Sequence, residues 1–205
     1  MAEYAGRTVL FDVSQVRPAG APLASGSGRA PGPGPLVRSL ECIRTVLETR
    51  LAEVGSPGRL RPIDCYDIVM HASDAVLSGG VRRSATICVF SPEYQEMATA
   101  KTGDWFVTNP QRGRSNNSAL LLRERTSKAV FEQLMVAVRE CGEPGFVWAD
   151  STEIIYNPCV EIGLYPVDQE TGLSGWAFCN LCEINMKACV TRDIFARAAA
   201  AAAIL

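Results

Sequence analysis

The sequence predicts an α/β fold, because short apolar segments typical of strands alternate along the chain with segments of helical periodicity. Four runs have the length and composition of short strands, at residues 9–13, 85–90, 118–122 and 146–148. Between them, apolar residues recur at three- and four-residue spacing, which indicates helices. Strands connected through helices run parallel, so we expect a parallel sheet. The uninterrupted apolar run at 85–90 predicts a strand buried on both faces.

Length and composition limit the class of protein. The chain has 205 residues, the length of one domain, with 47% hydrophobic and 20% charged residues, as in an ordinary globular protein. The net charge of −2 gives no electrostatic footprint for nucleic acid or an anionic membrane surface. No apolar run approaches the roughly 18 residues of a membrane span, and residues 1–4 lack the features of a signal peptide. We therefore expect a cytoplasmic protein with no nucleic-acid or membrane partner.

Two helices are predicted in the first half of the chain. The first covers residues 36–54, and its expected buried face consists of Leu36, Leu40, Ile43, Leu47, Leu51 and Val54. The second begins at Asp64 as N-cap and stops at Gly79 and Gly80, since glycine commonly ends a helix. It carries His71, the only histidine, which we interpret as a packed structural residue rather than a catalytic base.

Three further helices are predicted. One opens at Ser91 and Pro92 and ends at Gly103, and a polar loop follows at residues 109–117. Thr126 caps the next helix, which ends at Cys141 and Gly142 and has an apolar face of Val130, Phe131, Leu134, Met135 and Val138. The last helix begins after a cap at Thr191 and continues through the alanines at 198–202.

Two loops contain glycine together with arginine. Residues 17–35 are dense in Gly, Pro and Ser, and they form either an exposed linker or a phosphate-handling loop that uses Arg17 and Arg29. In residues 79–84, Gly79 and Gly80 precede Arg82 and Arg83. This pattern fits a mobile hinge with two anion-binding groups, but it also fits a helix C-cap followed by a solvated charge pair.

Eight cysteines could suggest a disulfide scaffold, but such scaffolds are typical of small secreted chains. Cys42 and Cys88 lie in apolar patterns and are expected to be buried small hydrophobic residues. Cys179 and Cys182 form a Cys-x-x-Cys pair, yet no second pair or histidine has the spacing of a zinc site. We therefore expect no metal site.

Residues 157–161, Asn-Pro-Cys-Val-Glu, carry the strongest chemical signal. Pro158 blocks a helix interior and biases Asn157 toward extended dihedral angles, so an extended segment is predicted. Alternate side chains of an extended chain leave the same face, which would direct Asn157, Cys159 and Glu161 at one volume. A neighbouring carboxylate disfavours the thiolate. Cys159 is thus expected to stay protonated and to act as a hydrogen-atom donor rather than as a nucleophile.

Five segments together resemble the large subunit of ribonucleotide reductases, and most closely the adenosylcobalamin-dependent branch (class II). They are residues 16–20, 79–85, 109–118, 157–161 and 178–181, in the order found in that family, and the resemblance covers nearly the whole chain. Val160 stands where the family often has glycine. We expect this change to be tolerated, because an extended chain points the side chain to the other face.

The resemblance implies a fold and a chemistry. The fold would be about half of a ten-stranded α/β barrel with a central finger loop at residues 157–161. Cys159 would carry the thiyl radical, Glu161 would act as general base, Asn157 would orient the ribose, and Cys179 would be one of two reducing cysteines. The loop at 17–35 would bind a deoxynucleotide effector, and residues 79–84 would pass the specificity signal to a ribonucleoside di- or triphosphate. The implied cofactor is adenosylcobalamin, with a dithiol reductant such as thioredoxin.

The same resemblance suggests that residues 1–205 are part of a larger barrel, truncated at both ends. The partner cysteine would lie upstream of Val9, and the phosphate-binding loop and the tail cysteines would lie beyond Leu205. We therefore expect the chain to be inactive alone. Two alternatives remain. A metal-dependent class I subunit would typically show leucine in place of Pro158, and a non-catalytic remnant or binding module would retain the motifs without turnover.

Overall fold

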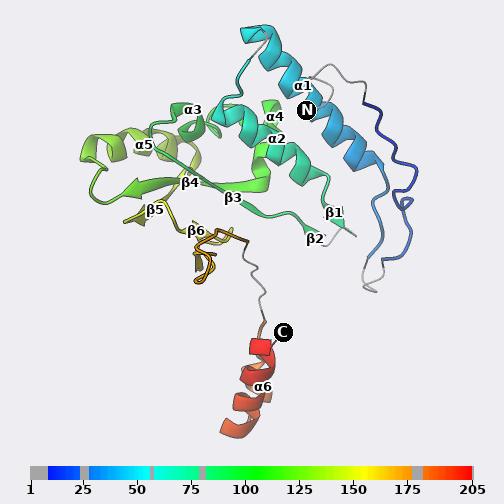
Figure 1. Cartoon of the computed structure of the whole chain (residues 1–205), viewed down its shortest axis with the longest axis vertical. Coiled ribbons are helices and arrows are strands. Elements are labelled where there is room, and N and C mark those ends of the chain that lie inside the picture. Colours follow the sequence, from blue (N-terminus) through cyan, green and yellow to red (C-terminus); the bar gives the residue numbers. More distant parts are fainter. Residues whose placement is uncertain (1–8, 24–27, 56–57, 79–81, 177–181, 205) are drawn as a thin grey trace. The chain divides into compact units, whose positions relative to one another are not determined.

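A parallel three-stranded sheet is the centre of the fold. The computed structural model describes residues 9–23, 28–55, 58–78, 82–176 and 182–204, with the backbone alone at 77–78 and 82–83. The sheet has the order β3 (Thr86–Phe90), β4 (Ser115–Leu122) and β5 (Gly145–Ala149), with both pairs parallel (Figure 1). Strand β3 pairs with β4 from Thr86 opposite Ser115 to Phe90 opposite Ala119. The predicted α/β class and parallel sheet are confirmed.

Three helices pack on one face of this sheet. They are α2 (Pro62–Asp74), α3 (Gln95–Ala98) and α5 (Lys128–Cys141). The core includes Met70 of α2, Leu121 of β4 and Leu134 of α5, which are the largest fully buried side chains in the described part of the chain. Because Ala119 and Leu121 both belong to this core, alternation along β4 assigns its odd-numbered side chains to the helix face.

Helices α1 (Gly34–Val54) and α2 lie side by side (Figure 1). The length of α1 matches the prediction, but Leu36, Leu51 and Val54 are exposed, so the expected face is not buried along its whole length. The N-cap of helix α2 is Arg61, three residues before the predicted Asp64. Asp64 is the third residue of the helix and accepts a hydrogen bond from the backbone N–H of Arg61 (2.8 Å), so its side chain still caps the first turn.

Helix α2 also ends earlier than predicted, at Asp74. The chain then enters β1 (Leu77–Ser78), which pairs antiparallel with β2 (Arg82–Arg83). Leu77 and Ser78 were expected to continue the helix, but they pair with β2 instead. Gly79 and Gly80, the predicted stop, lie outside the described residues.

Several predicted strand and helix boundaries move because of long-range contacts. Residues 9–13 form no strand. Only Phe90 of β3 is buried and Val89 is 36% exposed, so the prediction of burial on both faces is wrong; β3 is the end strand of the described sheet. Strand β4 starts at Ser115, three residues before the apolar run, since residues 115–117 pair with β3.

The predicted helix from Ser91 to Gly103 is also replaced by shorter elements. Helix α3 is followed by α4 (Trp105–Thr108) and a 3-10 turn, Pro110–Arg114. The hydroxyl of Ser91 binds Glu93 and does not cap a helix. By contrast, α5 has the predicted apolar face and ends at the left-handed Gly142 (φ 79°), with its N-cap at Ser127, one residue after the expected Thr126.

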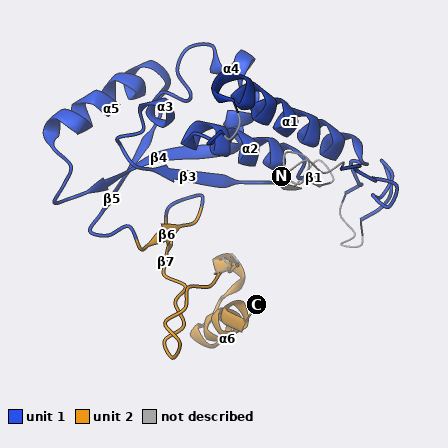
Figure 2. Cartoon of the chain, turned by 45° about the horizontal axis from the view of Figure 1, so that its top comes forward, with its two compact units in different colours: residues 1–152, 158–160 blue, residues 153–157, 161–205 orange. Residues whose placement is uncertain are grey.

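The chain divides into two compact units (Figure 2). The larger unit comprises residues 1–152 and 158–160, and the smaller comprises 153–157 and 161–205. The smaller unit contains the antiparallel pair β6 (Ile155–Tyr156) and β7 (Gly163–Leu164), the 3-10 turn Met186–Ala188, and α6 (Arg192–Ile204). Thr191 caps α6 as predicted, through a bond from the backbone N–H of Ile194. Within the described residues, no helix has both the length and the hydropathy to cross a membrane.

Candidate functional site

The segment with the strongest chemical signal is a turn between two strands. Tyr156 of β6 pairs with Gly163 of β7, so the chain reverses between them. Pro158 and Cys159 lie in a turn, and Val160 has φ of 69°. The predicted extended conformation of residues 157–161 is therefore wrong. The argument that alternate side chains share one face does not apply to a chain that reverses direction.

Val160 occupies the left-handed region of backbone dihedral angles. In this region Cβ approaches the backbone closely, at a cost of about 1–2 kcal/mol for an ordinary residue, and β-branched residues are among the least suited. Glycine has no such penalty, which matches the glycine common at this position in the resembling family. The expectation that valine is tolerated because it points to the other face assumed an extended backbone, and this reason is wrong.

Asn157 belongs to the smaller unit and forms two hydrogen bonds with the backbone of Ile162, at the other end of the loop. Its side chain is 5% exposed, and its Oδ1 accepts a hydrogen bond from the backbone N–H of Ile162 (3.0 Å). Its own backbone N–H donates to the carbonyl of Ile162 (3.4 Å). The amide oxygen thus holds the loop, and the amide nitrogen is the part of this side chain suited to donate to a ligand.

Cys159 and Glu161 are both exposed. They belong to different compact units, with Cys159 in the larger one and Glu161 in the smaller one together with Asn157. The convergence of Asn157, Cys159 and Glu161 on one substrate stays a prediction.

Asn116 of β4 contacts the cysteine-bearing turn. Its Nδ2 donates a hydrogen bond of 2.9 Å to the carbonyl oxygen of Pro158, and both residues belong to the larger unit. Asn116 was predicted to lie in a polar loop and was not singled out. Two adjacent asparagines next to an apolar run were the available signal, because neighbouring side chains of a strand leave opposite faces and one of the two would point away from the core.

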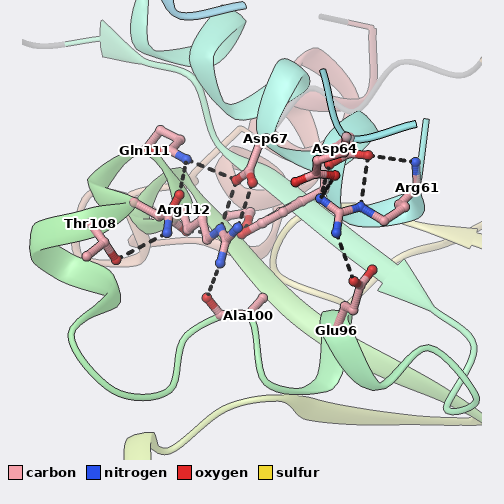
Figure 3. A network of polar contacts seen from close by, with 12 residues as sticks. Arg61, Asp64, Asp67, Glu96, Ala100, Thr108, Gln111 and Arg112 are labelled. Carbon is pink, nitrogen blue, oxygen red and sulfur yellow. Dashed lines mark hydrogen bonds and ion pairs between the residues drawn. The ribbon is translucent and has the colours of Figure 1, made fainter. Parts of the chain in front are cut away.

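A network of charged side chains holds the turn that precedes β4 (Figure 3). Arg112 donates to both carboxylate oxygens of Asp67 on α2, from Nε (2.8 Å) and Nη2 (2.6 Å), and a third bond runs from its Nη1 to the carbonyl of Ala100 (2.8 Å). Gln111 also donates to Asp67 (3.0 Å). Bidentate pairing fixes the direction of the guanidinium plane, so the start of β4 is tied to α2.

Buried polar contacts also hold Ser115, the first residue of strand β4. The carbonyl of Ser115 accepts from the buried Lys101 Nζ (2.5 Å), and the hydroxyl of Ser115 bonds to that of Tyr66 (2.8 Å). Burial raises the pKa of Tyr66 to about 12, although its hydrogen bonds to Ser115 and Asn117 act in the opposite direction. The Tyr66 hydroxyl is therefore protonated at neutral pH and can serve as a donor.

Comparison with known proteins identifies the family. A protein of Lactobacillus delbrueckii subsp. bulgaricus named adenosylcobalamin-dependent ribonucleoside-triphosphate reductase is 32% identical over 142 residues, which cover 69% of this chain and 18% of the relative. Proteins of the same name from Lacticaseibacillus paracasei and Euglena gracilis are 30% identical, over 87% and 71% of this chain. The chain belongs to the adenosylcobalamin-dependent ribonucleoside-triphosphate reductase family.

The chain spans only part of these reductases. It covers 18% to 24% of the length of the three relatives. No family model matches the sequence, and no solved structure matches it. The predicted family and branch are confirmed by the relatives' names.

The arginines expected to serve an effector loop both bond to the loop itself. Arg29 Nη1 donates to the carbonyl of Gly20 (2.8 Å), and Arg17 Nη1 donates to the carbonyl of Pro22 (3.4 Å). Pro22 and Arg29 also form an isolated antiparallel bridge. A guanidinium group has five N–H donors, so these bonds leave donors that could bind a phosphate. The structure does not describe most of the second loop: this applies to Gly79, Gly80 and the side chains of Arg82 and Arg83.

The remaining cysteines differ in their surroundings. Cys88 on β3 is half-buried, and burial raises the pKa of its thiol to about 11, as expected for a packed hydrophobic residue. Cys42 on α1 is exposed, so its predicted burial is wrong; the half-buried side chains of that helix, which include Leu40, Ile43 and Leu47, lie on another face. Cys182 is exposed, and Cys179 lies outside the described residues. Among the residues that the structure describes, no group of three or more His, Cys, Asp or Glu side chains could hold a metal ion.

Proposed function

We propose that the full-length protein reduces ribonucleoside triphosphates to deoxyribonucleoside triphosphates in an adenosylcobalamin-dependent reaction. The main support is that relatives with this name match between 69% and 87% of the chain. The relatives' names favour a triphosphate over a diphosphate as substrate. They do not favour the metal-dependent or non-catalytic alternatives.

Cys159 is proposed to carry the thiyl radical. The reaction replaces the ribose 2′-hydroxyl with hydrogen, and the radical on sulfur starts it by removing the 3′-hydrogen. The exposed position of Cys159 in a turn supports this role, because the sulfur can be approached without unfolding the loop. When bound, adenosylcobalamin would supply the radical chemistry by which the Cys159 thiol becomes a thiyl radical. The exposed thiol fits such a cofactor.

Glu161 and Asn157 are proposed to act on the ribose. Glu161 is exposed, and a carboxylate within hydrogen-bond reach of the 3′-hydroxyl can accept its proton as general base. Asn157 uses its amide oxygen to hold Ile162, so we assign contact with the ribose to its amide nitrogen. In this assignment one side chain both shapes the loop and orients the substrate.

Cys179 is proposed as one of two thiols that supply the electrons. Two thiols are oxidised to a disulfide, the 2′-hydroxyl leaves as water, and a hydrogen takes its place on the 2′ carbon. A thioredoxin-type dithiol would then reduce the disulfide for the next turnover. We assign no partner cysteine. Because the chain covers about a fifth of its relatives' length, we also propose that residues 1–205 alone do not turn over.

The two arginine-containing loops are proposed to control substrate choice. Arg17 and Arg29 would hold the phosphates of a deoxynucleotide effector, and residues 79–84 would carry the signal through Gly79, Gly80, Arg82 and Arg83. The antiparallel pairing of β1 with β2 supports this role, since it brings together the two strands that flank the specificity-loop residues in the sequence. The parallel strands β3, β4 and β5 are proposed to form part of the catalytic barrel, with residues 157–161 as its finger loop.

The test is Cys159→Ser in the full-length protein. A serine O–H bond is much stronger than a thiol S–H bond, so both nucleotide reduction and radical formation should be lost while nucleotide binding is retained. Cys65→Ser is the matched control, because Cys65 is also exposed but lies on α2. Turnover by Cys159→Ser at a rate near that of the wild type would show that the assignment of the radical is wrong.

A further inference from the structure

Asn116 lies on the face of β4 opposite the core. Ala119 and Leu121 belong to the core, and side chains alternate along a strand, so Asn116 points away from the helices. Its side chain is exposed, and from this face its Nδ2 reaches the carbonyl oxygen of Pro158, 42 residues later (2.9 Å). The bond connects the sheet with the turn that carries Cys159, within the larger unit.

The backbone that presents Asn116 is held on several sides. Asn116 is paired with Ile87 in the ladder between β3 and β4. Its neighbour Ser115 is bonded to the buried Lys101 and, through its hydroxyl, to the Oδ1 of Asn117 (2.7 Å). A buried strand with such contacts has few alternative conformations. The backbone position of Asn116, from which its side-chain amide extends, is therefore well defined.

The acceptor of this hydrogen bond is part of the peptide unit that leads into Cys159. The carbonyl of Pro158 and the backbone nitrogen and Cα of Cys159 lie in one plane. Holding the carbonyl oxygen therefore orients that plane. After this, only the φ and χ1 angles of Cys159 remain to place its sulfur.

We propose that Asn116 is a positioning residue for the radical chemistry of Cys159, which it serves by holding the Pro158 carbonyl. The inference rests on the proposed function of Cys159. Transfer of a hydrogen atom requires the reacting atoms to be close and aligned, and a displacement of about 1 Å can lower the rate on the order of 100-fold. Asn116 makes no direct contact with the reacting atoms in this role, and its contribution is the placement of the sulfur.

The test compares two substitutions with a matched control. Asn116→Asp keeps the size of the side chain but removes its N–H donors at neutral pH, whereas Asn116→Ser keeps a shorter donor. Asn185→Asp is the control, since the side chain of Asn185 accepts a hydrogen bond from the backbone of Lys187 (3.1 Å), and aspartate can still accept it. Because Asn116 is exposed, we expect wild-type circular dichroism from both variants, and the serine variant serves if the aspartate variant misfolds.

Two measurements on the full-length protein decide the proposal. In Asn116→Asp, amide hydrogen exchange at Cys159 and Val160 should be about threefold to tenfold faster, as expected for loss of one hydrogen bond. The kcat should fall by about tenfold or more with an unchanged KM for the nucleotide. Asn116→Ser should recover part of both effects, and Asn185→Asp should change neither.

Two results would overturn the role of Asn116. Unchanged exchange in Asn116→Asp would mean that the bond does not hold the turn. Faster exchange with wild-type kcat would mean that the bond is structural and does not position the thiol. Cys159→Ser separates this outcome from failure of the proposed function. An inactive Cys159→Ser with fully active Asn116 variants contradicts the positioning role alone, whereas an active Cys159→Ser contradicts the proposed function.

Discussion

Arg112 donates hydrogen bonds to both carboxylate oxygens of Asp67, so a bidentate ion pair joins the turn before β4 to helix α2 (Figure 3). The two side chains are only 14% and 11% exposed. An ion pair removed from water in this way depends on both partners, because a single charge left behind would be buried without compensation. The strand that presents Asn116 therefore depends on this contact.

The first prediction is that Asp67→Asn destabilises the chain by about 3 kcal/mol, since it leaves the Arg112 charge unpaired in a mostly buried place. Urea denaturation followed by circular dichroism measures this loss. Glu132→Gln on α5 is the matched control, because the pair of Lys128 and Glu132 is 87% and 63% exposed. It should cost at most about 0.5 kcal/mol. Equal costs for the two substitutions would contradict the importance of the Asp67 pair.

The second prediction concerns the backbone of the turn. Val160→Gly should raise the free energy of unfolding by up to about 1 kcal/mol, because relief of the left-handed penalty exceeds the added freedom of glycine in the unfolded chain. Val190→Gly is the control, as Val190 is exposed and is not among the described residues with positive φ. It should be neutral or destabilising. A loss of stability in Val160→Gly would show that the valine conformation is not strained.

The third prediction is a pH dependence that comes from His71. Burial lowers the pKa of His71, more than the nearby Asp67 and Asp74 raise it. The unfolded chain therefore binds more protons than the folded chain below about pH 6.5, and stability should fall as the pH decreases through the folded pKa. His71→Gln should flatten this slope between pH 7 and pH 5. No other histidine titrates in that window, so an unchanged slope in the variant would refute the assignment.

The fourth prediction separates the reducing thiol from the radical carrier. Cys179→Ser in the full-length protein removes one source of electrons but leaves the Cys159 sulfur in place. Radical formation should persist while multiple turnover fails, as detected by electron paramagnetic resonance and by deoxynucleotide analysis. Cys182→Ser, three residues away, is the control and should keep turnover. An equal loss of radical formation in Cys179→Ser and Cys159→Ser would mean that the two roles are not distinct.

The sequence by itself determined the α/β class, the parallel sheet, the long helices and the family. Helices α5 and α6 were predicted closely because their signals are local: an apolar face at helical spacing, a Ser or Thr cap, and Gly142 after α5. The motif around Cys159 was equally readable, since residue types and their spacing are properties of the sequence. The contacts that these elements make could not be read from the sequence.

Only the tertiary structure decided the conformation of the turn and the partners of β4. Pro158 favours extended neighbours, but the pairing of β6 with β7 reverses the chain and places Val160 at positive φ. Ser115 and Asn116 are polar and were predicted to be loop, yet pairing with β3 makes them strand, and Asn116 reaches Pro158 across 42 residues. These features depend on contacts between distant segments, and such contacts leave no periodic signal in the sequence because their free energy comes from partners that only folding brings together.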